Sequence, residues 1–95
     1  MLTYAYKHSI IALGWKEEAM KSTRELIATE LRIMRAKKNE SVETVADNSG
    51  VSRDTITWYE KNLTSPSIDN LEKLLNYYEV DFDIFFTNIY AYKHN

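Results

Sequence analysis

Apolar residues in the middle of the chain recur at the spacing of one helix face. Ser22 and Glu25 form a capping-box pattern, and the apolar positions that follow are Leu26, Ile27, Leu31 and Met34. We therefore predict a helix from about Thr23 to Lys38. Its basic last turn suits the negative end of the helix dipole, and the following Asn39 tolerates the left-handed backbone of a C-cap.

Residues that cap helices precede four further apolar patterns, and they are Ser41, Ser52, Ser67 and Asp81. The first of these predicted helices ends near Asn48-Ser49-Gly50. The second runs from Arg53 to about Lys61. The third carries an apolar side made of Ile68, Leu71, Leu74, Leu75 and Tyr78, and the last is a short helix containing Ile84 and Phe85. The stretch from Asn62 to Pro66 reads as a loop.

The outer segments give a weaker pattern. Apolar positions between Leu2 and Trp15 are partly alternating and partly clustered, so residues 1–22 are compatible with a strand, a helix or both. We interpret this segment as an N-terminal extension, and an upstream read-through, a cloning remnant and an added oligomerisation element all remain open. Residues 23–87 are expected to form the domain and residues 88–95 a C-terminal tail.

Composition favours one helical domain. With 95 residues, two units would each lack a sufficient core, and two glycines and one proline are too few for an all-β fold. Cysteine is absent, which excludes disulfides and thiolate zinc sites and fits a reducing compartment. The stretch from Ile10 to Trp15 is too short for a signal peptide or a membrane span, so we expect a cytoplasmic protein without a membrane partner.

Charge is distributed unevenly along the chain. The formal total of -2 is unusual for a protein that binds phosphate. Between Lys21 and Lys38, however, six basic residues stand against two acidic ones, a local charge of +4. Any attraction to nucleic acid must therefore be local.

Two short predicted helices joined by a glycine turn form a helix-turn-helix pattern between Ser41 and Leu63. Ala46 is small where two helices would cross closely, Gly50 permits a positive φ in the turn, and Val51 can fill the junction. Each of these residue types thus has a steric reason at its position.

The stretch Ser41–Glu60, followed by Pro66-Ser67 and by Val80–Phe86, resembles the phage-repressor (Cro/cI-like, xenobiotic-response-element) helix-turn-helix family. The resemblance covers about Ile27 to Phe86. It implies an all-α, five-helix, lambda-repressor-like domain that binds operator DNA, usually as a dimer. It also implies that Arg35 and Glu60 form a structural ion pair, although Arg35 on a phosphate is a competing interpretation.

Four positions depart from the family pattern. Val42 stands where members usually carry a glutamine that contacts DNA, and Glu40 stands where an apolar residue is usual. Asn62 and Glu79 replace common glycines, and of these two residue types asparagine tolerates a positive φ better. We expect local strain or an altered helix end at Glu79.

A recognition helix presents the side chains of its first two turns to the base edges of the major groove. On that geometry the expected base contacts are Arg53, Asp54, Thr57, Trp58 and Lys61. Arg53 can reach a guanine or a phosphate, Asp54 can accept from cytosine N4 or orient Arg53, and Thr57 can touch a thymine methyl. Trp58 either packs on thymine methyls or a sugar, or covers apolar surface of residues 1–22.

Helix starts and the loop after the recognition helix supply hydroxyls, amides and backbone N–H groups that can hold phosphates. The expected phosphate contacts are Ser41, Thr44, Asn62, Thr64, Ser67 and Asn70. Simple helix capping is an equally good interpretation of the serines at 41 and 67. Three basic residues, Arg32, Lys37 and Lys38, are most simply a solvated helix end.

Other chemistry is poorly supported. His8 and His94 have no second ligand at metal spacing, and Asp81 and Asp83 look like helix-start residues rather than paired catalytic carboxylates. We therefore expect no metal, no cofactor and no enzymatic activity. Four apolar or aromatic residues exceed what a small core needs, and they either build a subunit interface or fold back on the domain: Tyr77, Ile89, Tyr90 and Tyr92.

These features predict a sequence-specific transcriptional regulator, most simply a repressor, that occupies a palindromic operator as a homodimer. Two-fold symmetry would place the two helices that begin at Arg53 about 34 Å apart in successive major grooves. The alternative is an antitoxin or adaptor that acts mainly by binding another protein, which the acidic total and Val42 favour.

Overall fold

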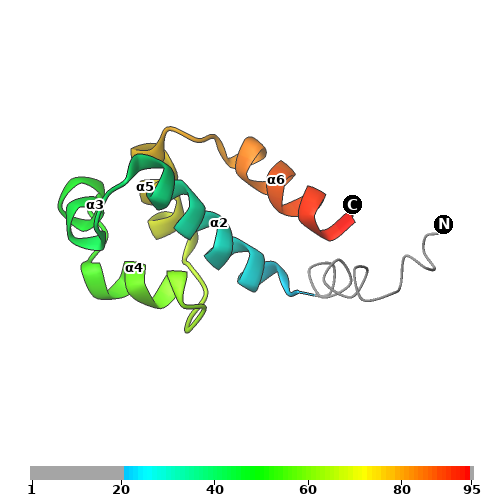
Figure 1. The fold of residues 1–95 in the computed structure, drawn as a ribbon, viewed down its shortest axis with the longest axis horizontal. Coiled ribbons are helices and arrows are strands. Elements are labelled where there is room, and N and C mark those ends of the chain that lie inside the picture. Colours follow the sequence, from blue (N-terminus) through cyan, green and yellow to red (C-terminus); the bar gives the residue numbers. More distant parts are fainter. Residues whose placement is uncertain (1–20, 95) are drawn as a thin grey trace.

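The computed structural model describes residues 21–94, and this part of the chain contains five α-helices and no strand (Figure 1). The helices are α2 (Thr23–Lys38), α3 (Val42–Ser49), α4 (Arg53–Glu60), α5 (Ile68–Tyr78) and α6 (Phe82–His94). The predicted all-α, five-helix fold is confirmed over this range. The expectations for the N-terminal extension fall on residues that, apart from the last two, lie outside the described range. None of the described helices is both long and apolar enough to cross a membrane.

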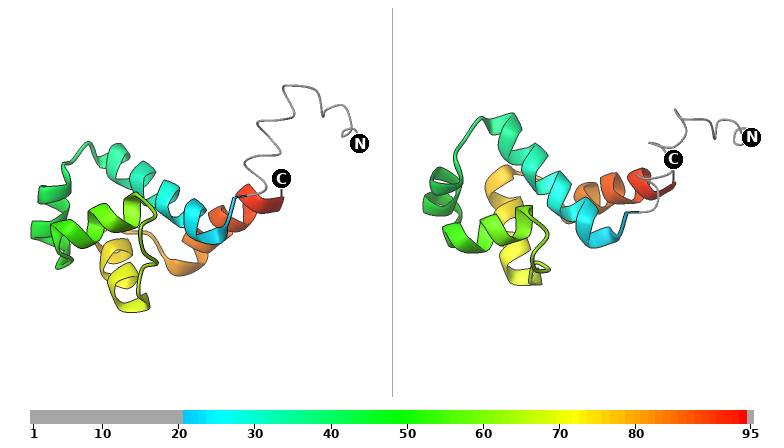
Figure 2. Two further views of the ribbon diagram at one scale, coloured as in Figure 1. Left: turned by 90° about the horizontal axis from the view of Figure 1, so that it is seen from below. Right: turned by 60° about the horizontal axis from the view of Figure 1, so that its bottom comes forward.

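Helix α2 is the central element of the fold. It contacts α4 on one side and α6 on the other, while α3 packs on α4 and α5 (Figure 1). Helix α6 runs antiparallel to α2, as the two views of Figure 2 show. Its last turns therefore lie beside the first turns of α2, where Lys93 Nζ is 3.5 Å from Thr23 Oγ1.

Serine side chains begin four of the helices, as the sequence predicted. The Ser22 hydroxyl accepts from the backbone N–H of Glu25 at 3.1 Å, and the Glu25 carboxylate accepts from the N–H of Ser22 at 2.8 Å, which completes the capping box. The hydroxyls of Ser41, Ser52 and Ser67 each accept from the N–H three residues later. Each cap satisfies an N–H that the helix itself leaves unpaired.

Positive φ angles occur where the sequence suggested them. Asn39 (55°) and Gly50 (86°) end α2 and α3, and Asn62 (59°) lies in the loop after α4. Glu79 (61°) ends α5, and its N–H donates to the carbonyls of Leu75 and Asn76. Glutamate therefore occupies a left-handed C-cap that glycine usually fills, at a conformational cost.

Replacing Glu79 by glycine is expected to raise the free energy of unfolding by roughly 0.5–1 kcal/mol, because glycine adopts a left-handed backbone without a Cβ clash. Urea unfolding followed by circular dichroism measures the change. Asn39→Gly is the matched control and should gain less, since asparagine already tolerates this conformation. A Glu79→Gly variant no more stable than the parent would show that the cap carries no strain.

The core gathers apolar side chains from all five helices and from the turn between α3 and α4. Its most deeply buried members are Leu26, Leu31, Val45, Ile56, Leu74, Leu75 and Phe85. Burying this many large apolar groups is the main term that holds such a small domain together.

The last helix is longer than the short one that the sequence predicted. It continues to His94, through residues expected to form a tail, because Ile89 lies one turn beyond Phe85 and is also buried. The hydroxyl of Tyr92 donates to the buried carboxylate of Glu30 on α2 at 3.1 Å. Ile89 and Tyr92 thus fold back onto the domain, whereas Tyr90 keeps 64% of its surface exposed.

Candidate nucleic-acid interface

The turn between α3 and α4 sets the direction of α4. Gly50 ends α3 in a left-handed conformation, and the next residue, Val51, is buried in the core. Ile56 and Tyr59 then anchor the inner side of α4, and Ala46 of α3 packs beside the same core. Ala46, Gly50 and Val51 therefore help to hold one face of α4 against the domain.

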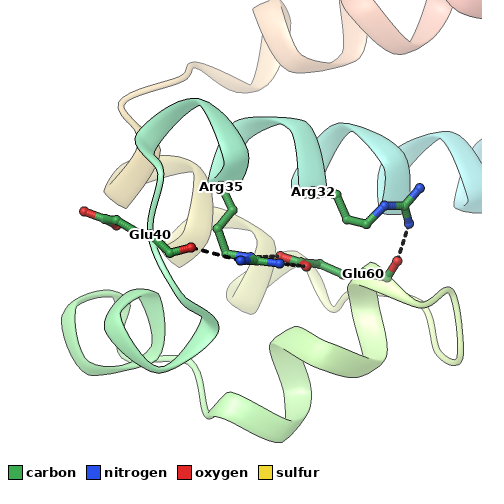
Figure 3. Close-up of polar contacts among 4 residues, drawn as sticks. All are labelled: Arg32, Arg35, Glu40 and Glu60. Atoms are coloured by element: carbon green, nitrogen blue, oxygen red, sulfur yellow. Dashed lines mark hydrogen bonds and ion pairs between the residues drawn. The ribbon is translucent and has the colours of Figure 1, made fainter.

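The two residues expected to form a structural ion pair lie together between α2 and the end of α4 (Figure 3). Arg35 donates from Nε to Glu60 Oε2 at 2.9 Å and from Nη2 to Oε1 at 2.8 Å, and its Nη1 donates to the carbonyl of Glu40 at 2.9 Å. Glu60 is buried, and its hydrogen bonds raise the pKa of Arg35 further above the usual range. Such a planar, two-bond pair locks the end of α4 to α2.

Two further arginines fasten the end of α4, a role that was not predicted for them. Arg32, expected to be solvated, donates to the backbone carbonyl of Glu60 (Figure 3). It also donates to Thr29 Oγ1 at 3.2 Å. Arg24 Nε donates to Asn62 Oδ1 at 2.7 Å. The i, i+3 spacing of Arg32 and Arg35 was a signal that both reach the same neighbour, but nothing local identified that neighbour.

Glu40, which stands where an apolar residue was expected, has a polar partner. The hydroxyl of Tyr77 donates to Glu40 Oε1, and this hydrogen bond raises the pKa of Tyr77. Lys38 Nζ lies 5.0 Å from the centre of the Tyr77 ring, within the range of a cation–π contact. Tyr77 therefore links α5 to the connection between α2 and α3.

The five expected base contacts lie on α4 and at its C-terminal end. The side chains of Arg53 and Asp54 are 59% and 69% exposed, and Trp58 is 48% exposed. Lys61 is exposed as well, whereas Thr57 is only half-exposed. The structure therefore leaves four of these side chains open to a ligand and partly covers the fifth.

Arg53 has two acidic neighbours. Its Nη1 donates to Glu43 Oε2 of α3 at 3.2 Å, and its Nη2 lies 3.7 Å from Asp54 Oδ1. The backbone N–H of Glu43, at the start of α3, and then the Arg53 guanidinium lower the pKa of the Glu43 carboxyl. The contact between Arg53 and Asp54 was one of the expected alternatives, but the contact with Glu43 was not foreseen.

The expected phosphate contacts fall into two groups, one at the start of α3 and one in the segment after α4. In the first, the hydroxyl of Ser41 caps α3 and donates to Thr44 Oγ1 at 3.0 Å. In the second, Ser67 caps α5, Asn70 Nδ2 donates to the Tyr59 hydroxyl at 2.9 Å, and Asn62 accepts from Arg24. The remaining member, Thr64, is exposed in the loop.

Comparison with known proteins finds a matching family model and a related repressor. A family model described as helix-turn-helix matches residues 31–85, which run from α2 into α6. The chain is 33% identical over 55 residues to the cryptic phage CTXphi transcriptional repressor RstR of Vibrio cholerae. That alignment covers 58% of this chain and half the length of the relative. No solved structure gives a significant match.

Proposed function

The chain belongs to the helix-turn-helix family of DNA-binding regulators, and on that premise we propose that it represses transcription by inserting α4 into the major groove of an operator. The observation that carries the proposal is the way in which α4 is held against the rest of the domain. Its inner face and its C-terminal end are fixed, by Ile56 and by the Arg35–Glu60 pair, while its outer face is exposed. A short helix held in this way keeps its outward side chains in a fixed register for base edges.

Arg53 is the proposed main base reader, because a guanidinium can donate two hydrogen bonds to guanine O6 and N7. Asp54 accepts from cytosine N4 or orients Arg53, and Thr57 offers its methyl to thymine. Trp58 packs its exposed face on thymine methyls or a sugar. Lys61, at the end of α4, reaches a base or the adjoining backbone.

The proposed phosphate contacts flank α4 in the chain and are Ser41, Thr44, Asn62, Thr64, Ser67 and Asn70. Hydrogen bonds within the protein hold five of them, Ser41, Thr44, Asn62, Ser67 and Asn70, and this supports the proposal because polar groups already held in place lose little freedom when they bind a phosphate. The two capping serines also mark helix starts, where backbone N–H groups and the helix dipole favour an anion.

We also propose that the repressor is a homodimer on a palindromic operator, as two-fold symmetric recognition requires. Helix α6 supports this proposal because three of its large apolar residues, Ile84, Phe86 and Tyr90, are exposed. Exposed large apolar side chains are typical of interaction surfaces. The number of chains bound per duplex, from sedimentation of the complex, checks this part of the proposal.

Fluorescence anisotropy with labelled duplexes from the DNA upstream of the protein's own coding sequence tests the proposed function. We expect one fragment to bind more tightly than the others, with an affinity that falls as salt rises, because phosphate contacts release counterions. A footprint on that fragment should show two half-sites about one helical turn apart. If no fragment binds even at low salt, the protein acts instead through a protein partner, as an antitoxin or adaptor would.

A further inference from the structure

A hollow between α3 and α4 carries acidic groups on a surface that the proposed function turns toward DNA. Its volume is about 440 Å³, and its lining includes Glu43, Asp47 and Arg53 together with the turn at Gly50. Carboxylates there oppose phosphate binding. The carboxylates of Glu43 and Asp47 nevertheless lie beside Arg53, the proposed base-reading residue.

Arg53 forms ion pairs with acidic residues on this surface. The guanidinium lies between two carboxylates, 3.2 Å from Glu43 and 3.7 Å from Asp54. The Glu43 side chain is 62% exposed, so an incoming phosphate can reach both members of the pair. A phosphate that binds Arg53 thus competes with an existing ion pair.

Building on the proposed function, we propose that Glu43 is a specificity-determining residue that holds Arg53 back from phosphates on DNA of arbitrary sequence. On such DNA, Arg53 would exchange its carboxylate partners for a single phosphate, while Glu43 repels the backbone. On the matching sequence, two N–H groups of the guanidinium donate to guanine O6 and N7, and its remaining donors still hold the Glu43 carboxylate, so the ion pair is kept. Glu43 therefore lowers the affinity for arbitrary DNA more than the affinity for the operator.

The simpler role of Glu43 is to interact with the dipole at the start of α3, since acidic residues are favoured in a first helical turn. That role makes no use of Arg53. Coupling between Glu43 and Arg53 in DNA binding therefore separates the two roles.

A double-mutant cycle measures this coupling. Glu43→Gln, Arg53→Ala and the double variant are titrated by anisotropy against a mixed-sequence duplex of about 20 base pairs and against the tightest upstream fragment. With Arg53 present, Glu43→Gln is expected to raise the affinity for the mixed duplex about threefold to fivefold, the upper part of the range for one exposed ion pair. The gain on the tightest fragment, and the gain on the mixed duplex without Arg53, should each stay below about twofold.

Asp47→Asn is the matched control. It removes one negative charge from the same hollow, one turn further along α3, and within residues 21–94 Asp47 forms no ion pair with Arg53. An equal gain in affinity from Asp47→Asn, or a gain from Glu43→Gln that persists without Arg53, would show a general charge effect and overturn the proposal. Either result leaves the proposed function standing. If the parent protein binds neither duplex, both this proposal and the proposed function are overturned.

Discussion

Replacing Arg53 by alanine is expected to weaken binding to the tightest operator fragment by roughly tenfold to a hundredfold. A two-bond contact between arginine and guanine contributes about 1–3 kcal/mol of discrimination, and Arg53 is the exposed residue of α4 best suited to make one. Anisotropy titrations at several salt concentrations measure the loss. If Arg53 reads a base, the loss is confined to the preferred fragment and the salt slope is retained.

The salt slope also separates the two expected roles of Arg53. If the guanidinium binds a phosphate, Arg53→Ala should lower affinity for every sequence and reduce the slope by about one. Lys37→Ala is the control, since it removes a positive charge from the last turn of α2. Unchanged operator affinity in Arg53→Ala would refute the role of α4 as the reading helix.

Replacing Glu60 by alanine is expected to lower the free energy of unfolding by about 2–4 kcal/mol. Removing one partner of a buried pair leaves the other charge uncompensated, which typically costs about 3–5 kcal/mol. Arg35 keeps 25% of its side chain exposed, so water partly compensates the loss. Urea unfolding gives the free energy, and for a domain of this size the melting temperature should fall by roughly 10–20 °C.

Glu72→Ala is the control for this substitution, because it removes an exposed carboxylate from α5 and should change stability by less than about 0.5 kcal/mol. The double variant Arg35→Met, Glu60→Leu should recover part of the loss, since an apolar pair leaves no unpaired charge. A Glu60→Ala protein as stable as the parent would mean that the pair does not hold α4.

Local patterns determined most of the secondary structure. Ser22, Ser41, Ser52 and Ser67 begin helices because each hydroxyl accepts from an N–H only three residues away, a contact that depends on no distant residue. The turn at Gly50 and the left-handed Asn39 follow from backbone preferences of single residues. The resemblance to phage repressors then supplied the five-helix domain and the Arg35–Glu60 pair.

Tertiary structure decided which distant side chains meet. Arg24 and Asn62 are 38 residues apart, and Glu30 and Tyr92 are 62 apart, so no local spacing relates them. The length of α6 also depends on a distant element, since its last turns pack against α2. These contacts exist because burial of the apolar core sets the directions of the helices.

The pairing of Arg53 with Glu43 has the same origin. Sequence alone identified Arg53 as the first residue of an exposed helix, because a capping serine and the apolar spacing are local. The angle at which α3 crosses α4 decided that a carboxylate ten residues earlier lies 3.2 Å from its guanidinium. That angle is set by packing around Val45, Val51 and Ile56, whose side chains are directed by the whole core.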